Sequence, residues 1–174
     1  IFVHRPHDGV AETEATPIAT KIAAEIRSLL MAPHPDPAIE IDADLRPEGK
    51  KGALVRTLDS YQSYYDRWSI SWESQALLRA DYAAGDEKLA ADFLEVINPL
   101  RWPSNGMPEA EIREVRLLKA RMEAERLPKG ANPALHLKLG KGGLSDVEWV
   151  AQLIQLRFAG SHAALQKTST IETL

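Results

Sequence analysis

The sequence predicts an α+β fold, with a small sheet unit over residues 1–58 and a mostly α-helical bundle over residues 59–174. Two observations lead to this prediction. Within the first 58 residues, apolar and polar side chains alternate in short runs, which is typical of β-strands with one buried face. From residue 59 onward, apolar residues recur at spacings of three and four, which is typical of amphipathic helices.

The composition is that of an ordinary globular chain and excludes several classes of protein. Hydrophobic residues make up 44% and charged residues 26% of the 174 residues, and the formal net charge is −4. We expect no nucleic-acid partner, because no broad excess of basic residues is available for a phosphate backbone. The chain has no cysteine, so disulfides and thiolate metal sites are excluded. No apolar run approaches the ~20 residues of a membrane span, and no basic-then-apolar leader is present, so we expect a cytoplasmic protein without membrane contact.

The chain opens with strand-like residues and continues into a helix. Residues 1–3 are Ile-Phe-Val without a preceding methionine, so we expect a piece of a larger protein that begins at the edge of a sheet strand. Thr16 followed by Pro17 predicts the start of a helix over residues 17–31, because threonine is a good N-cap and proline suits the first helical position. The face expected to pack on the sheet consists of Ile18, Ile22, Ile26, Leu29 and Leu30.

Residues 39–45 alternate most clearly and predict a second strand. Ile39, Ile41, Ala43 and Leu45 alternate with Glu40, Asp42 and Asp44. Because same-face residues on a strand lie about 6–7 Å apart, the three carboxylates would form a short row. Residues 53–58 are expected to return as the hairpin partner of this strand.

A row of carboxylates needs positive charge nearby. The basic residues that follow are Arg46, Lys50, Lys51 and Arg56. A divalent cation is the other candidate, because carboxylate oxygens suit Mg²⁺. A solvated polar strand face remains the alternative without any ligand.

The rest of the chain predicts helices joined by glycine- and proline-rich turns. We expect helices over residues 72–84, 86–97, 108–127 and 145–159, with partial helix over residues 161–174. The aromatic residues Tyr61, Tyr64, Tyr65, Trp68 and Trp72 indicate a core or a domain seam, with stacking on a nucleotide base as the alternative. The stripes expected to be buried are Ile112, Val115, Leu118 and Met122 in one helix, and Val147, Val150, Ala151, Ile154 and Phe158 in another.

Two function classes remain after the motifs are weighed. The segment Gly140-Lys141-Gly142-Gly143 lacks the ending of a phosphate-binding loop, and Ser145 with Glu148 is typical of a helix capping box. The acidic strand is best interpreted as part of a two-metal site for phosphoryl or nucleotidyl transfer. The competing class is a non-catalytic helical interaction module.

Three sequence blocks resemble one known family, the bacterial glutamine synthetase adenylyltransferases. Asp42, Leu45-Arg46-Pro47-Glu48-Gly49 and Gly52-Ala53-Leu54-Val55 are similar to the family's V-D-x-x-L-R-P-x-G-x-x-G-x-L-V signature. The segment Trp72 to Ala80 is similar to its W-E-x-Q-A-L-x-R-A helix, and Lys138 to Glu148 is similar to its K-L-G-x-G-G block. The order and spacing agree along nearly the whole chain.

The resemblance implies a partial nucleotidyltransferase domain over residues 1–58 and a helical bundle over residues 59–174, with Mg²⁺ and ATP as cofactors. Such enzymes carry two related copies of this unit, one that attaches AMP to a tyrosine of glutamine synthetase and one that removes it by phosphorolysis. Ser145-Asp146 looks more like the attaching copy. The resemblance also implies that Asp42 is a metal ligand that can help to deprotonate the tyrosine, with Glu40 and Asp44 as neighbours. Arg46, Lys50 and Arg56 are candidate phosphate contacts, although solvated loop charges remain the alternative for Lys50 and Lys51.

The same resemblance implies that part of the site lies elsewhere. The family's Gly-Ser-Asp-x-Asp motif, which supplies two further metal carboxylates, is expected just before Ile1, so we predict that the isolated chain is inactive. Glutamine synthetase is the expected partner, and a PII-type signal protein is a further candidate. The side chains Glu73, Gln75, Arg79, Asp146 and Glu148 can face a cleft or serve as helix caps and interhelical pairs.

Overall fold

The computed structural model describes residues 1–174, which form two compact units. One unit comprises Ile1–Trp68 and Tyr82–Val96, and the other comprises Ser69–Asp81 and Ile97–Leu174. A two-stranded sheet and seven α-helices confirm the α+β class. The two units are defined by which residues contact one another, and contacts do not reveal function. The functional division between residues 58 and 59 therefore remains a prediction.

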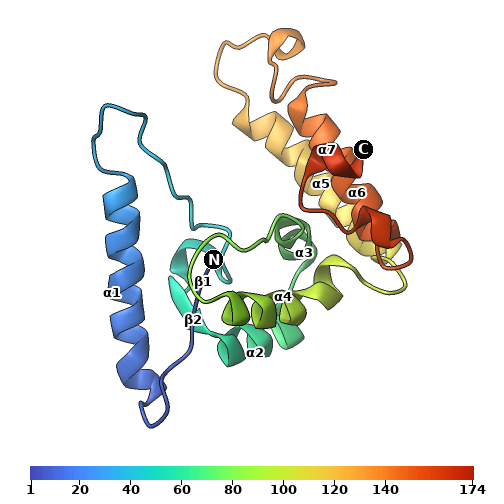
Figure 1. Ribbon diagram of the computed structural model, residues 1–174. Helices are drawn as coiled ribbons and strands as arrows, with labels where there is room; N and C mark the ends of the chain where they lie inside the picture. Colours follow the sequence, from blue (N-terminus) through green and yellow to red (C-terminus); the bar gives the residue numbers. More distant parts are fainter. The chain divides into compact units, whose positions relative to one another are not determined.

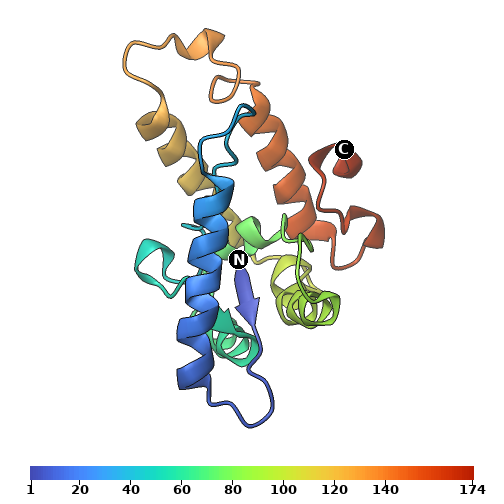
Figure 2. The same cartoon turned by 60° about the vertical axis from the view of Figure 1, so that its left-hand side comes forward.

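The sheet of the first unit joins the start of the chain to a strand more than fifty residues later. Strand β1 (Phe2–His4) runs parallel to β2 (Val55–Thr57), and Phe2 lies opposite Val55. Helix α1 (Glu12–Leu30) lies along both strands in the two ribbon views (Figure 1, Figure 2). The strand predicted at residues 53–58 is therefore present in part, but it does not form the predicted hairpin.

Residues 39–45 do not form the predicted strand, because their backbone groups bond to local partners. The Ile39 N–H donates to the Leu30 carbonyl (3.1 Å), and the Ile41 carbonyl accepts from Arg27 (3.3 Å). The Asp44 N–H donates to Asp42 Oδ1 (2.8 Å), a turn that competes with extended pairing. The predicted row of three carboxylates is therefore absent.

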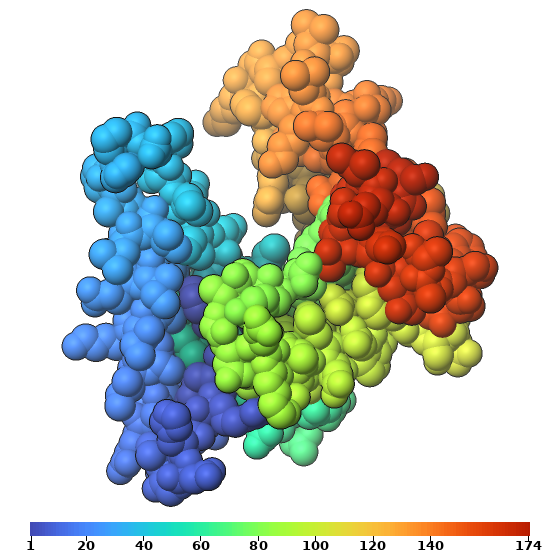
Figure 3. Space-filling view, viewed as in Figure 1, coloured from blue at the N-terminus to red at the C-terminus, as the bar shows by residue number.

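Helix α1 begins earlier than predicted and presents its apolar face to solvent. It starts at Glu12, so Pro17 lies inside it. The Thr16 hydroxyl is not a cap, because it lies 2.9 Å from His4 Nε2. The predicted buried face is exposed at all five positions, Ile18, Ile22, Ile26, Leu29 and Leu30. Figure 3 shows the side chains of α1 (blue) standing free along this face of the first unit, in which Ala23 is the buried residue of the helix.

The core of the first unit is aromatic. Helix α2 (Leu58–Trp68) supplies Tyr61 and Tyr65, and α4 (Glu87–Arg101) supplies Phe93, whose ring meets that of Tyr61 edge-on at 5.2 Å. The Tyr61 hydroxyl donates to the Phe2 carbonyl (3.2 Å), and burial raises its pKa to about 12. The prediction that the aromatic cluster forms a core is confirmed for Tyr61 and Tyr65.

The second unit is a set of short and long helices around one hydrophobic cluster. Its helices are α3 (Ser71–Leu77), α5 (Glu109–Arg126), α6 (Leu144–Phe158) and α7 (Thr170–Thr173), with the last turn of α4. The cluster consists of Leu78, Met107, Ile112, Val115, Trp149 and Leu156. Leu118 and Met122 pack against it, which confirms the predicted stripe of α5. Helix α7 lies beside α6 (Figure 1).

Two predictions for this unit are wrong. Helix α3 ends at Leu77 rather than at residue 84, and α6 turns a different face to the core. Of the stripe predicted to be buried in α6, Ala151 alone is buried, and Val147, Val150, Ile154 and Phe158 are exposed. The physical reason is that Gln152 and Gln155 hydrogen-bond inside the unit, so the helix is held by polar partners on the face next to Trp149 and Leu156.

Three short 3₁₀ turns complete the chain, at Gly49–Lys51, Pro133–Leu135 and Ala163–Leu165. The last of these, with α7, confirms the predicted partial helix after residue 161. None of the helices combines the length and the apolar character needed to cross a bilayer.

Candidate functional site

The loop that follows Asp42 is built around one arginine. Arg46 donates to three backbone carbonyls of its own loop, those of Ala43 (2.7 Å), Gly52 (3.0 Å) and Lys50 (3.0 Å). A side chain at Gly52 would place its Cβ 1.9 Å from the Pro47 carbonyl oxygen, so only glycine fits there. The predicted phosphate contact Arg46 is thus a residue whose guanidinium already holds the loop together.

The carboxylates of this region have different surroundings. Asp42 is exposed and accepts one backbone hydrogen bond, from Asp44. Asp44 pairs with Lys50 (3.2 Å) and lies 3.9 Å from Arg46, so these two basic side chains already neutralise the charge of its carboxylate. The Lys50 side chain is 81% exposed. Of the predicted metal-site row, Glu40 and Asp42 are both exposed and without an ion pair, and Asp42 is the one that the family resemblance implies as a metal ligand.

The side chains of this chain form no cluster that would hold a metal ion without a bound substrate. No group of three or more histidine, aspartate or glutamate side chains lies together in the structure. Mg²⁺ is held by one or two carboxylates together with substrate phosphates and water. Asp42 is exposed and could supply one such carboxylate.

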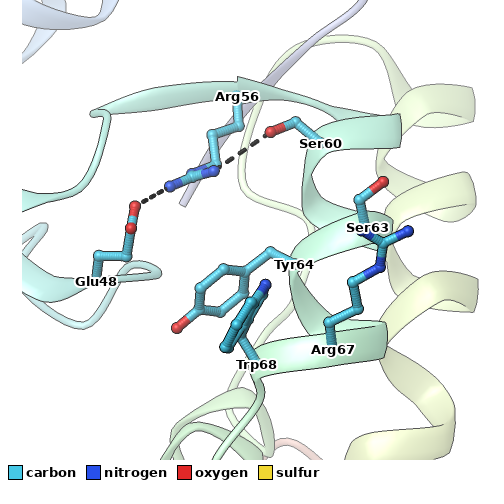
Figure 4. A pocket seen from close by; sticks show the side chains of 7 residues that line it. All are labelled: Glu48, Arg56, Ser60, Ser63, Tyr64, Arg67 and Trp68. Carbon is cyan, nitrogen blue, oxygen red and sulfur yellow. Dashed lines mark hydrogen bonds and ion pairs between the residues drawn. The ribbon is translucent and has the colours of Figure 1, made fainter.

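A pocket of about 640 Å³ lies between the loop and α2. It is lined by Glu48, Arg56, Ser60, Ser63, Tyr64, Arg67 and Trp68. Figure 4 shows Arg56 between Glu48 and Ser60, with Tyr64 and Trp68 next to one another and Arg67 beside Ser63. The Arg56 guanidinium forms an ion pair with Glu48 and donates to Ser60 Oγ (3.3 Å). Its carbon lies 5.6 Å from the centre of the Tyr64 ring, a cation–π distance.

Arg56 is the predicted site residue with the most distinctive environment. Its side chain is 16% exposed, yet its Nε–H is buried without any hydrogen-bond acceptor. An unmet buried donor costs roughly 1–3 kcal/mol. This pocket can hold an anion against Arg56, together with a planar group against the aromatic pair.

Sequence reasoning did not assign Glu48 to a pocket, and it named Trp68 only within an aromatic cluster for which stacking on a nucleotide base was the alternative. Glu48 is the one non-glycine residue with a positive φ (62°), a conformation that costs roughly 1–2 kcal/mol, and it carries the carboxylate that meets Arg56. Trp68 is 69% exposed at the pocket wall. The spacing of Ser60, Tyr64 and Trp68, four residues apart on one helix, was the available signal, because such residues share a face.

In the second unit the signature residues join helices to one another. Gln75 Nε2 donates to Gln152 Oε1 (2.7 Å) in the buried interior, and the Gln152 amide donates to Glu148 (3.3 Å). Arg79 reaches Glu148 (3.1 Å) and also bonds to the Thr168 carbonyl and the Thr170 hydroxyl. Glu73 accepts the Ile70 N–H (3.1 Å) at the start of α3. These contacts favour the interpretation as caps and interhelical pairs.

Asp146 also connects two segments of the second unit. Its carboxylate pairs with Lys119 of α5 and accepts the Gly142 N–H (2.6 Å), and the two hydrogen bonds lower the pKa of Asp146. The predicted capping box is wrong, because Gly143 is the N-cap of α6 and Glu148 bonds to Arg79 and Gln152. Asp146 thus ties the glycine loop to α5.

Comparison with known proteins identifies relatives of the whole chain. Residues 1–96 match the family model of glutamate-ammonia ligase adenylyltransferase, and residues 112–174 match that of GlnD PII-uridylyltransferase. Relatives include a protein of Streptomyces coelicolor (60% identical over 98% of this chain) and one of Nocardia farcinica (52% over 100%). A third, from Mycobacterium tuberculosis, is 49% identical over 100% of the chain.

All three relatives are named bifunctional glutamine synthetase adenylyltransferase/adenylyl-removing enzyme. The chain covers 17% of the Streptomyces and Nocardia proteins and 18% of the Mycobacterium protein, so it corresponds to about one sixth of such an enzyme. The adenylyltransferase family model covers more than half of the chain. The chain belongs to the glutamate-ammonia ligase adenylyltransferase family.

Proposed function

We infer that this chain is part of an enzyme that transfers an adenylyl group from ATP to a tyrosine of glutamine synthetase, in the cytoplasm, and so regulates nitrogen assimilation. The observation that carries the proposal is the similarity to bifunctional adenylyltransferases along the entire chain, with identities of 49–60%. Residues 1–58 would then be part of a nucleotidyltransferase domain, and residues 59–174 a helical domain that orients the protein partner.

In this reaction the tyrosine oxygen attacks the α-phosphorus of ATP. A bond forms between these atoms, the bond to the bridging oxygen breaks, and pyrophosphate leaves with the bonding electrons. The hydroxyl proton must go to a base, for which the exposed carboxylate of Asp42 is suited. When bound, Mg²⁺ would neutralise phosphate charge, with Asp42 as one ligand and further carboxylates from outside these residues.

The basic residues would bind phosphate in two ways. Lys50 is exposed beside Asp44 and can swing towards an anion. Arg56 lines the pocket and already holds a carboxylate, so a phosphate oxygen can take the same position. Arg46 would act mainly by shaping the loop, because its donors are bonded to carbonyls.

The direction of the reaction is the finer part of the proposal. Ser145-Asp146 resembles the attaching copy more closely, which favours addition of AMP over its removal by phosphorolysis. The relatives' name covers both activities, so the removing copy is the second candidate. The match of residues 112–174 to a PII-uridylyltransferase family supports a PII-type signal protein as a further partner.

A non-catalytic interaction module is the alternative from another class. The observation in its favour is that α1 and α6 both present apolar faces to solvent in this structure. It predicts that the full-length protein binds glutamine synthetase equally well with and without the Asp42 carboxylate, and that this carboxylate affects no reaction.

The experiment compares full-length wild-type protein with the variant Asp42→Asn. Incorporation of AMP into glutamine synthetase is followed with ATP and Mg²⁺, and phosphorolysis of the adenylylated enzyme is followed in parallel. We expect the variant to lose adenylylation by at least about 100-fold. Full activity in the variant would refute the role of Asp42. If the variant loses phosphorolysis alone and keeps adenylylation, the chain belongs to the removing copy.

A matched control is Asp66→Asn, an exposed aspartate of α2 whose carboxylate contacts Gln62. It removes the same charge from the same unit. We expect it to leave both reactions unchanged, which ties the effect to position 42. The isolated 174-residue chain is predicted to be inactive in either direction.

A further inference from the structure

The contact between Arg56 and Glu48 closes a pocket that is otherwise suited to a ligand. Arg56 presents a largely buried guanidinium, and the carboxylate that meets it comes from the loop residue Glu48. The Glu48 side chain is 57% exposed, so its carboxylate meets Arg56 from the solvent side. The Glu48 backbone has a φ of 62°, a strained conformation for a residue other than glycine. An incoming anion can therefore replace this carboxylate without entering the core.

Arg56 also keeps unused capacity for hydrogen bonds. Its Nε–H is buried and has no acceptor, although the terminal nitrogens bond to Glu48 and Ser60. A phosphate group offers several acceptor oxygens and can bond to Nε and a terminal nitrogen together, as a fork. The single carboxylate of Glu48 does not meet the Nε–H here.

The aromatic side of the pocket adds a second recognition element. Tyr64 and Trp68 are four residues apart on α2 and lie next to one another in Figure 4. Trp68 is 69% exposed although it lines a pocket of about 640 Å³, a volume within the usual range for small-molecule sites. Purine rings stack on such exposed indoles, which gives preference for a planar ligand over a simple anion.

We propose that this pocket binds a nucleoside phosphate, whose phosphate displaces Glu48 from Arg56 and whose base stacks on Trp68. Glu48 thereby acts as an internal competitor that occupies the phosphate position until the nucleotide arrives. The choice of ATP as the nucleotide rests on the proposed function, but the displacement and the stacking rest on this pocket alone. An acidic peptide would use Arg56 without needing the indole face.

The test measures binding to full-length protein by calorimetry, without glutamine synthetase, so that no AMP acceptor is present. ATP and inorganic tripolyphosphate are the two probes. We expect Glu48→Gln to bind both probes about 2- to 5-fold more tightly, because the competing charge is removed. Arg56→Met should weaken both by at least about 10-fold.

Trp68→Ala separates the two parts of the proposal. It should weaken ATP by roughly 10-fold and leave tripolyphosphate unchanged, because only ATP carries a base to stack. Arg113→Met, an exposed arginine of α5, is the matched control for charge and should change neither affinity. Glu48→Gly also removes the competing carboxylate, so it should bind both probes more tightly than the wild type. Because glycine adopts a positive φ without strain, this variant should fold at least as well as the wild type.

Unchanged affinities for both probes in Glu48→Gln and Glu48→Gly would overturn the displacement. Equal loss of ATP and tripolyphosphate in Trp68→Ala, or no loss of either, would overturn nucleotide recognition and favour an anionic peptide site. These results are independent of the adenylylation assay. If the full-length wild type attaches no AMP to glutamine synthetase while the pocket variants shift ATP affinity as expected, the proposed reaction fails and the nucleotide site stands. Full activity in Asp42→Asn would refute the role of Asp42 alone.

Discussion

In the second unit, side chains of the signature blocks hydrogen-bond across helices, whereas in the first unit Asp42 is left exposed and one donor of Arg56 has no acceptor. Gln75 meets Gln152 in the interior, and Arg79 meets Glu148. In the first unit Asp42 is exposed, and the Arg56 Nε–H has no acceptor. Asp42, Gln75, Arg79 and Glu148 all lie in blocks that resemble the family, but Asp42 is exposed whereas the other three are bonded to partners.

The difference teaches how to separate architecture from chemistry in one chain. A fully bonded polar residue in a core specifies how helices pack, because removing one partner leaves the other unsatisfied. A charged residue at an open pocket whose donors or acceptors are not all paired can form further hydrogen bonds or ion pairs with a ligand. By this criterion we propose that the first unit carries the chemistry and that the second is the scaffold.

The largest expected effect is on the core of the second unit. Leu156→Ala, in a side chain with no exposed surface, should lower the free energy of unfolding of the 174-residue chain by about 2–5 kcal/mol. Chemical denaturation followed by circular dichroism measures it. Ile22→Ala in α1 is the matched control, since Ile22 is 55% exposed and its truncation should cost less than about 0.5 kcal/mol. Equal costs would show that α1 is covered.

A smaller effect is expected from the buried amide pair. Gln152→Leu should destabilise the chain by about 1–3 kcal/mol, because it leaves the Gln75 amide buried without its acceptor. The double variant with Gln75→Leu should recover part of this loss. A double-mutant cycle in urea measures the coupling, and strictly additive single effects would contradict a scaffold role for the pair.

The smallest effect concerns pH. Hydrogen bonds from Lys119 and from the Gly142 N–H lower the pKa of Asp146 below its usual value near 3.8. Its contribution is therefore fully present above that value and is lost as pH falls through the lower folded-state pKa. Asp146→Asn should remove up to about 1 kcal/mol at pH 7, and the difference from wild type should shrink in strong acid. Unfolding curves at pH 7 and pH 2.5 test this, and a difference that grows in acid would contradict the assignment.

Sequence reasoning was most successful where local patterns decide the structure. Pro108 and Leu127 bound α5 as predicted, and Asp86 caps α4 through the Leu89 N–H (2.7 Å). The buried face of α6 was predicted wrongly from periodicity. Periodicity considers apolar side chains alone, whereas Gln152 and Gln155 are buried because they have hydrogen-bond partners inside the unit. Periodicity also failed at residues 39–45, where an alternating pattern predicts a strand only if a neighbouring strand is available.

The candidate site was predictable in part. Asp42 and Arg56 follow from the residue types and from the resemblance, and both lie in the first unit. The role of Glu48 could not be foreseen, because it depends on a positive φ and on a contact eight residues along the chain. The loop function of Arg46 likewise depends on three carbonyls whose positions only the folded backbone determines.

The division between chemistry and scaffold is tested most directly by measuring both properties for two variants of the full-length protein. Asp42→Asn should lose at least about 100-fold of the AMP incorporation into glutamine synthetase and keep the melting temperature of the wild type within about 2 °C. Gln152→Leu should lower the melting temperature and keep the activity of the protein that remains folded. Lost stability with full activity in Asp42→Asn, or lost activity with full stability in Gln152→Leu, would contradict this division.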